Sequence, residues 1–222
     1  MSIKLYKWSP ELAYALGLIA TDGNLSKDQR HIDFTSKDIS LVKTFKKCLN
    51  LNNKIGVKYG SKNYIKKRYY RVQFSDTHFY RWLEKIGFTY RKSKTIANLN
   101  IPKKYFRDFL RGHLDGDGDI VTYKDYYNIS KNSKYIYDRI YIRFRSASKK
   151  HALWIRENIS KQNLLKGSFF EQKTQRKDQT TSIWTLRFAK KESIKLIYWL
   201  YYKQKLPCLM RKRKIAEKFL SI

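Results

Sequence analysis

Apolar positions along the chain follow two periods, one helical and one alternating. The apolar run from 10 to 22 begins after Ser9, has Pro10 at its first position and stops before Gly23, and these features predict a helix. Apolar residues recur at helical spacing over 38–49 and 77–86. Between these helices, short runs predict strands over 24–27, 31–36, 54–59 and 64–74.

The same order of elements recurs in the second half of the chain. Matching the residues before the second helix of each half pairs Ser36 with Ser148, which makes the hairpin after Asp117 longer than the hairpin after Asp22. The second half is predicted to contain helices over 105–114, 151–162 and 192–202, strands over 119–127, 135–145, 168–175 and 182–188, and a final helix over 211–220.

Each half opens with an apolar helix that ends in Asp-Gly. Asp22 and Asp117 are the two acids, and Gly17 and Gly112 each lie five residues before them. A small residue within a helix lets a second helix approach closely, so a crossing at these glycines would bring both acids to one place. Two neighbouring carboxylates repel each other until a cation neutralises them, which predicts a divalent metal ion.

The runs over 15–23 and 110–118 resemble the LAGLIDADG homing endonucleases in their single-chain, two-motif form. The first run departs from the name motif at Ala15, Leu16, Ala20 and Thr21, and the second carries Arg111 and His113 at positions that are usually apolar. The resemblance covers the whole chain as two repeats. It implies an α+β fold of tandem αββαββα repeats with pseudo-two-fold symmetry, two antiparallel sheet saddles and the motif helices packed at the interface. The expected half-domains are 1–87 and 103–222, joined by a linker over 88–102.

The composition indicates what kind of partner the protein binds. With 49 Lys and Arg against 18 acids, the formal net charge is +31, and 42% hydrophobic residues are enough for a packed core. Such a charge indicates a polyanionic partner, although on charge alone ribosomal-type binding and membrane-surface attachment stay open. Cys48 and Cys208 are far apart, which supports neither a disulfide framework nor a zinc site and fits a reducing compartment.

We expect no membrane partner, because no apolar run reaches the roughly 18 residues that a spanning helix needs. The bias toward Lys, Ile, Asn and Tyr is typical of an AT-rich genome. The expected location is therefore intracellular, in an organelle (mitochondrion or chloroplast) or in the bacterial cytoplasm.

The family resemblance implies the active-site residues. The last acid of each motif binds the catalytic metal in that family, which assigns Mg²⁺ to Asp22 and Asp117, with Mn²⁺ or Ca²⁺ able to substitute for binding. The resemblance also implies that the backbone carbonyls of Thr21 and Gly116 complete the metal shell. One basic residue per half is expected near the scissile phosphates, and the matching positions are Lys92 and Lys212. If the acids only ended their helices, they would oppose the helix dipole, which makes that alternative unfavourable.

The predicted strands explain where DNA would bind. In the strand over 64–74, Arg71 and Gln73 alternate with Tyr70, Val72 and Phe74, so one face suits a core and the other suits base edges and phosphates in the major groove. Ser36 and Ser148 precede helices, where the family positions water and where a helix-capping role is equally consistent. The DNA-binding candidates are Lys27, Arg30, Ser36, Lys37, Lys66, Arg68, Arg71, Gln73, Lys124, Arg139, Tyr141, Arg143, Arg145, Ser148, Gln172, Lys173, Gln175 and Arg176.

The sequence thus predicts a monomeric, site-specific homing endonuclease that binds a long double-stranded DNA target and cuts both strands with Mg²⁺. Two alternatives on the same scaffold stay open. One is a maturase that binds intron RNA. The other is a non-catalytic DNA-binding regulator, which we would expect to have lost one of the two acids.

Overall fold

The computed structural model describes residues 6–59, 68–173 and 182–220, and within these ranges the two halves contain the same series of elements. The first half comprises α1 (Pro10–Asp22), β1 (Gly23–Leu25), β2 (His31–Ser36), α2 (Ile39–Cys48), β3 (Gly56–Tyr59), β4 (Arg68–Ser75) and α3 (Thr77–Ile86). The second half comprises α5 (Phe106–Gly116), β5 (Asp119–Asp125), β6 (Tyr137–Ser146), α6 (Lys149–Asn163), β7 (Ser168–Gln172), β8 (Ile183–Phe188) and α7 (Lys190–Leu200). Outside the repeats lie α4 (Lys92–Thr95), the 3-10 helix η1 (Lys103–Tyr105) and α8 (Met210–Leu220).

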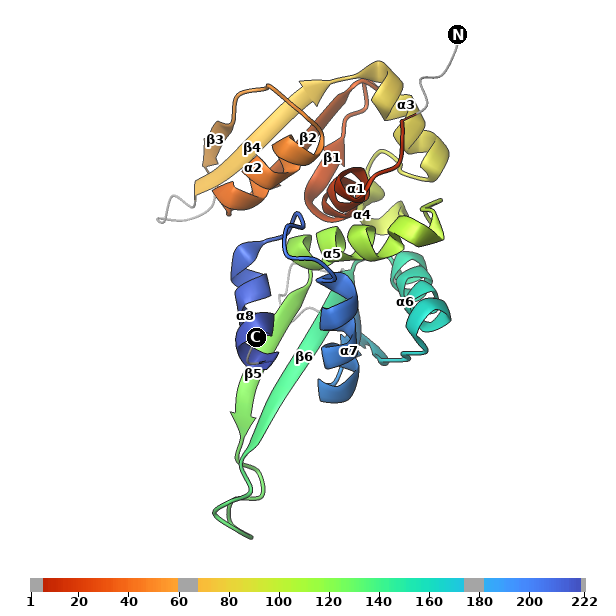
Figure 1. Cartoon of the computed structure of the whole chain (residues 1–222). Helices are drawn as coiled ribbons and strands as arrows, with labels where there is room; N and C mark the ends of the chain where they lie inside the picture. The colour runs from red at the N-terminus through yellow and green to blue at the C-terminus, as the bar shows by residue number, and fades with distance from the viewer. Residues whose placement is uncertain (1–5, 60–67, 174–181, 221–222) are drawn as a thin grey trace.

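Each half contains one four-stranded sheet, and all its neighbouring strands are antiparallel. The strand orders are β1-β2-β4-β3 and β5-β6-β8-β7, so the two halves have the same topology. Figure 1 shows α1 and α5 side by side at the centre of the molecule, with the first sheet on one side of the pair and the second on the other. The predicted α+β class and the tandem αββαββα order are confirmed.

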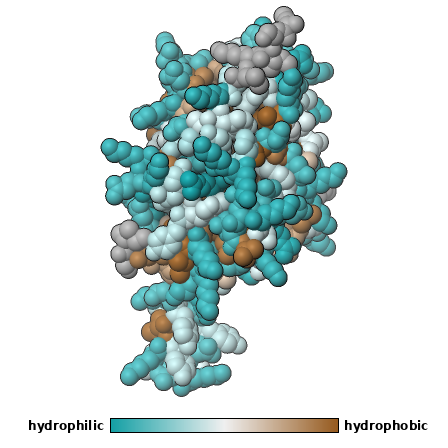
Figure 2. All heavy atoms as spheres, turned by 45° about the vertical axis from the view of Figure 1, so that its right-hand side comes forward, coloured by the Kyte–Doolittle hydropathy of each residue, from teal (hydrophilic) through white to brown (hydrophobic). Residues whose placement is uncertain are grey.

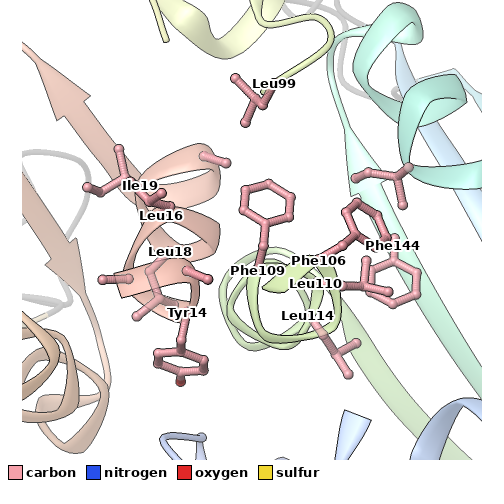
Figure 3. Packing of buried hydrophobic residues seen from close by; sticks show 14 of the residues in the cluster. Tyr14, Leu16, Leu18, Ile19, Leu99, Phe106, Phe109, Leu110, Leu114 and Phe144 are labelled. Atoms are coloured by element: carbon pink, nitrogen blue, oxygen red, sulfur yellow. The ribbon is translucent and has the colours of Figure 1, made fainter. Parts of the chain in front are cut away.

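The central helix α1 is buried on all sides. Every residue from Leu12 to Ala20 is buried, because the helix packs on its own sheet with one face and on α5 with the other. Such a helix is apolar all round rather than amphipathic, as its sequence shows. Figure 3 shows the corresponding packing of α5, whose Phe106 and Leu110 lie toward Phe144 of the second sheet.

The two central helices cross at their glycines, as predicted. A Cβ atom on Gly17 would lie 2.1 Å from the carbonyl oxygen of Phe109, and a Cβ on Gly112 would lie 2.1 Å from the carbonyl oxygen of Tyr14. No side chain fits at either place, so the backbones approach as closely as they do only because both residues are glycine. This crossing brings the C-terminal ends of both helices together.

The match of Ser36 with Ser148 was wrong by two residues. The hydroxyl of Ser36 accepts a hydrogen bond from the backbone N–H of Asp38 at 3.2 Å, and the hydroxyl of Ser146 accepts one from the N–H of Ser148 at 3.1 Å. Ser36 therefore corresponds to Ser146, and the helix caps Asp38 and Ser148 correspond to each other. The hairpin after Asp117 is still longer than the hairpin after Asp22, but by two residues fewer than the match of Ser36 with Ser148 implied.

The segment predicted as a linker contains a short helix. Here α4 follows Arg91, which adopts the left-handed backbone conformation with φ 57°. Its first residue, Lys92, is buried. Throughout the ranges that the structure describes, no helix has the length and apolar character needed to cross a membrane.

Candidate active site and nucleic-acid interface

Asp22 and Asp117 lie at the C-terminal ends of α1 and α5, where the crossing of these helices brings the two halves together. Both residues are exposed, whereas the helical turns that carry them are buried. A carboxylate at this end of a helix is not stabilised by the helix dipole, and here two carboxylates lie in each other's field. The arrangement is therefore unfavourable unless cations are close.

The pKa values of the acids record this environment. Although Asp22 reaches solvent, the protein packed around its carboxylate reduces the solvation, and this partial burial and the charge of Asp117 together raise its pKa to about 6, against the opposing effect of Lys92 and Lys212. Burial also raises the pKa of Asp117 above its ordinary value, opposed by Lys92, Lys212 and Arg145. The two carboxylates repel each other and are poorly solvated, and a bound cation would relieve both effects.

Lys92 contacts the C-terminal end of α1. Its Nζ atom donates a hydrogen bond to the carbonyl oxygen of Thr21 at 3.0 Å. Burial lowers the pKa of Lys92 to about 8, although the charges of Asp117 and Asp22 act to raise it. An ammonium group has three N–H donors, so this one hydrogen bond within the described part of the chain leaves two donors for another acceptor.

Lys212 supports the end of α5 and is held far more tightly. Its Nζ atom lies 2.7 Å from the carbonyl oxygen of Leu114, 2.8 Å from that of Asp115, 2.7 Å from that of Gly118 and 3.5 Å from that of Gly116. The three short bonds account for all three N–H donors. Burial lowers the pKa of Lys212 to about 8, against the opposing charge of Asp115.

A buried polar network fixes the segment that leads to Lys212. Asp115 accepts hydrogen bonds from the hydroxyl of Tyr14 and from the N–H of Leu209, both at 2.7 Å. Arg111, which is fully buried, pairs with Asp108 at 2.8 Å and donates to the carbonyl oxygens of Leu200 and Pro207. The sequence placed Arg111 at a usually apolar position, and these bonds explain why a charge is tolerated there.

A pocket of 250 Å³ opens beside Asp117. Residues from both halves line it, among them Thr21 from the first half and His113 and Arg145 from the second, together with Ser93 of α4. His113 is buried, and its Nδ1 atom has no hydrogen-bond partner among the residues described. The pocket gives solvent and small ligands access to Asp117.

The donor set fits a hard divalent cation. Within the described ranges, no three His, Cys, Asp or Glu side chains gather at one place, so a closed zinc-type site is not formed there. Mg²⁺ prefers oxygen ligands, keeps several waters, and is commonly bound through one or two carboxylates plus substrate phosphates. Two carboxylates with carbonyl oxygens nearby match that preference. An oxygen has two lone pairs, so the carbonyl oxygen of Thr21 can bind a cation while it accepts the hydrogen bond from Lys92.

The outward faces of the two sheets carry the predicted DNA-binding residues. In β4, Val72 and Phe74 are buried, whereas Gln73 is exposed and Arg71 is half-buried on the other face. In β6, Ile140, Ile142 and Phe144 are buried against the helices, and Arg139, Tyr141, Arg143 and Arg145 alternate with them. Also exposed are Lys27, Arg30, Lys37, Arg68, Gln172 and Lys173, and Ser36 is half-buried.

Some of the predicted contacts are not on these faces, and among them Ser36 and Arg68 have the strand parity of the buried Phe34 and Val72. Ser148 is buried, caps α6 through the N–H of His151 and hydrogen-bonds the carbonyl oxygen of Ile96, so its role is structural. Lys124 has the strand parity of the buried Ile120 and lines a groove against α7 and α8. Lys66, Gln175 and Arg176 lie outside the described residues.

Acidic residues on the outward faces hold the arginines in place, which the sequence alone did not reveal. Arg71 pairs with Asp33 at 3.0 Å, and Arg143 and Arg145 pair with the two oxygens of Asp119 at 2.6 and 2.9 Å. Arg187, which sequence reasoning did not assign, is exposed on β8 and stacks over the rings of Tyr141 and Phe170. Its alternation with Leu186 and Phe188 was the signal that could have identified it.

The comparisons with known proteins agree with this geometry. Residues 9–87 match the family model of the LAGLIDADG-like domain. The fold is similar to that of full-length DUF199/WhiA from Thermatoga maritima, with a TM-score of 0.57 and 14% identity over 99% of this chain and 63% of that chain. It is also similar to the homing endonuclease I-WcaI bound to its DNA recognition sequence (TM-score 0.61, 13% identity, 96% of this chain and 88% of that chain). A third similar structure is I-DmoI in complex with DNA and Mn (TM-score 0.51, 17% identity, 88% of this chain and 98% of that chain).

No curated protein matches the sequence. This chain spans about 63% of the length of the full-length WhiA structure. The predicted resemblance to the LAGLIDADG family is confirmed, because residues 9–87 match the model of the LAGLIDADG-like domain and nearly the whole chain shares the fold of solved LAGLIDADG homing endonucleases.

Proposed function

We propose that this protein is a site-specific homing endonuclease that cuts both strands of duplex DNA in a metal-dependent reaction. The observation that carries the proposal is the pair of acids, Asp22 and Asp117, which end two crossing helices beside the buried lysines Lys92 and Lys212. The pair lies between two sheets whose outward faces carry arginine and glutamine. A duplex that follows both sheets would therefore pass its central base pairs over the acids.

The sheets would read the target. A β-ribbon fits the major groove, where Arg contacts guanine and Gln contacts adenine bidentately, at about 1–3 kcal/mol of discrimination for each good pair. The ion pairs of Arg71 with Asp33 and of Arg143 with Asp119 hold these side chains in defined positions before DNA arrives. The net charge of +31 supplies the sequence-independent attraction to phosphates.

The acids would hold the metal, with the carbonyl oxygens of Thr21 and Gly116 as further ligands. Bound Mg²⁺ would supply an activated water and charge neutralisation at the scissile phosphate. Lys92 keeps N–H donors free and would donate them to a phosphate oxygen. Mn²⁺ or Ca²⁺ would substitute for binding, and the I-DmoI structure with DNA and Mn supports such a site on this fold.

We propose half-domains 1–87 and 103–222 joined by the linker 88–102. Because one chain supplies both acids, it would act as a monomer. An intron origin and an organelle or bacterial location would agree with this function.

The test is cleavage of a randomised duplex library with Mg²⁺, followed by the variants Asp22→Asn and Asp117→Asn on the selected target. Each variant should lose about a thousandfold or more in double-strand cleavage, the equivalent of several kcal/mol of barrier, and keep DNA binding. Glu157→Gln removes the same charge from an exposed position on α6 and should cut normally. Near-normal cleavage by either acid variant would disprove the assignment.

The outcome of the library experiment also separates the alternatives. Selective duplex binding by the parent without any cleavage would identify a non-catalytic DNA-binding regulator. Selective binding of intron RNA with stimulation of splicing would identify a maturase, and this activity is compatible with cleavage.

A further inference from the structure

The hairpin formed by β5 and β6 projects beyond the rest of the second half and carries exposed aromatic side chains. We call residues 122–139 the finger. Figure 1 shows that the finger extends past the helices, and Figure 2 shows it standing out from the body with hydrophilic, neutral and hydrophobic surface side by side. Tyr127 is 88% exposed, and the other exposed large hydrophobic residues of the finger are Tyr123, Tyr126, Ile129, Tyr135, Ile136 and Tyr137.

The finger is organised by its own hydrogen bonds and ring contacts. Its connection contains successive turns, in which the N–H of Ile129 donates to the carbonyl oxygen of Tyr126 and the N–H of Tyr135 donates to that of Asn132. The rings of Tyr123 and Tyr141 stack at 6.0 Å, and those of Tyr135 and Tyr137 stack at 6.3 Å. The tyrosines are therefore presented to solvent in a defined arrangement, which reduces the entropy lost when a partner binds.

A groove of 740 Å³ continues this surface at the base of the finger. It has a floor of apolar side chains from α7 and α8 and a rim of lysines. One of these lysines, Lys190, lies over the ring of Phe219 at 5.6 Å. The residues that define the groove for this argument are Lys124, Lys190, Ile194, Ile215, Lys218 and Phe219.

We propose that the finger and this groove together bind unpaired nucleotides of a single-stranded nucleic acid. Unpaired bases expose their faces, which stack on aromatic side chains, whereas a duplex shows a protein only its base edges and its backbone. The finger supplies tyrosine rings, and Lys131 and Lys134 are exposed between them for phosphates. Tyr123 and Tyr137 continue the outward face that carries Arg139, whereas Tyr126 and Tyr127 lie in the connection between the strands, beyond the arginines that suit base edges.

The apolar floor of the groove lies apart from the proposed duplex-binding surface, and Arg139 borders both. The helices α7 and α8 cover the sheet face that contains Ile140 and Ile142, and the groove lies on that side. Arg143 and Arg145 lie on the opposite face. A duplex bound across the outward faces would leave the groove open, so a single strand and a duplex can be bound at once, and the proposal does not depend on DNA cleavage.

The experiment measures the affinity of the full chain for a short labelled oligouridylate, the matching oligothymidylate and a blunt duplex, at a salt concentration that suppresses non-specific binding. The double variant Tyr126→Ser with Tyr127→Ser should bind both single strands about tenfold or more weakly, the loss expected for removed base stacking, and should bind the duplex normally. Tyr198→Ser alters a similarly exposed tyrosine on α7 and should change neither affinity. A second variant, Lys190→Glu with Lys218→Glu, should weaken single-strand binding and leave the finger intact.

Ultraviolet cross-linking of the bound oligouridylate to the parent protein provides an independent measurement. Cross-links should map to the finger or to the groove, and they should persist when a duplex is bound. Unchanged single-strand affinity in both variants, cross-links confined to the outward sheet faces, or an equal loss of duplex binding in the tyrosine variant would each overturn the proposal. The last result would instead show that the finger belongs to the duplex site.

Discussion

The two halves of the molecule share one topology but support their acids differently. At the end of α1, Lys92 makes one hydrogen bond to the residues that the structure describes, to the carbonyl oxygen of Thr21. At the end of α5, Lys212 makes three short bonds to carbonyl oxygens and one long one. The position of Asp115, which ties Tyr14 to Leu209, is occupied by Ala20 in the first motif.

This difference indicates a division of roles between the two lysines. Lys212 closes the end of a helix and is locked in place by the network around Asp115 and Arg111. Lys92 is carried by a four-residue helix and keeps donors free. A pseudo-symmetric scaffold therefore does not guarantee two equivalent active sites, because the loops that deliver the lysines differ between the halves.

The largest effect is expected at the one place where the halves are equivalent, the helix crossing. Gly17→Ala and Gly112→Ala each force a Cβ atom to 2.1 Å from a backbone oxygen of the other helix, which should cost about 3 kcal/mol or more of unfolding free energy. Urea denaturation measures the loss. Gly56→Ala is the control, since its Cβ would meet its nearest neighbour at 3.8 Å. A clear difference between Gly17→Ala and Gly112→Ala would contradict an equivalent crossing.

The lysines should differ in their contribution to stability. Lys212→Met leaves several buried carbonyl oxygens without a donor and should cost about 2–3 kcal/mol, whereas Lys92→Met removes one bond and should cost about 1 kcal/mol. Denaturation without divalent metal compares the two variants directly. Equal losses would show that the extra bonds of Lys212 add nothing.

The free donors of Lys92 should make the two strands unequal in cleavage. The strand whose phosphate accepts from Lys92 should be cut about tenfold faster, which corresponds to about 1.4 kcal/mol of barrier. A target labelled on one strand at a time, and a supercoiled plasmid that passes through a nicked form, measure this order. Lys92→Met should remove the bias. Simultaneous cutting of both strands by the parent would refute the division of roles.

The smallest effect concerns the acids in the absence of metal. The folded-state pKa of Asp22 is about 6 against an ordinary value of 3.8, so the folded protein holds the proton more tightly and loses stability as the pH rises through this window. Asp22→Asn should therefore stabilise the metal-free protein above pH 6, on the order of 1 kcal/mol after solvent screening, and have no such effect below pH 3.8.

Asp38→Asn serves as the control, because its effect on the unfolding free energy should have the opposite sign to that of Asp22→Asn. Burial acts to raise the pKa of Asp38, but hydrogen bonds from Ser40 outweigh it and lower the pKa overall. Thermal melting across pH compares the two variants. A stabilisation by Asp22→Asn that does not depend on pH would contradict the electrostatic origin of the effect.

The local pattern of the sequence determined the elements and the crossing of the two central helices. Helix caps, apolar spacing and strand alternation depend on neighbouring residues, so the bounds of α1 at Pro10 and Asp22 and of α3 at Thr77 and Ile86 follow from the chain itself. The crossing at Gly17 and Gly112 was also predictable, because a glycine at the same place in two apolar helices removes the side chains that would keep their backbones apart.

Only the tertiary structure decided how Lys212 is held in the second half and where two of the predicted DNA contacts, Lys124 and Ser148, lie. Lys212 meets the end of α5 across 98 residues of sequence, through a loop fixed by the buried Arg111 and Asp115, and no local pattern encodes such a contact. Lys124 lines the groove because α7 and α8 cover its side of the sheet. Ser148 caps α6 because β6 ends at Ser146, two residues before the position that the match of Ser148 with Ser36 implied. Periodicity specifies which residues share a face, whereas the packing of distant elements decides what that face meets.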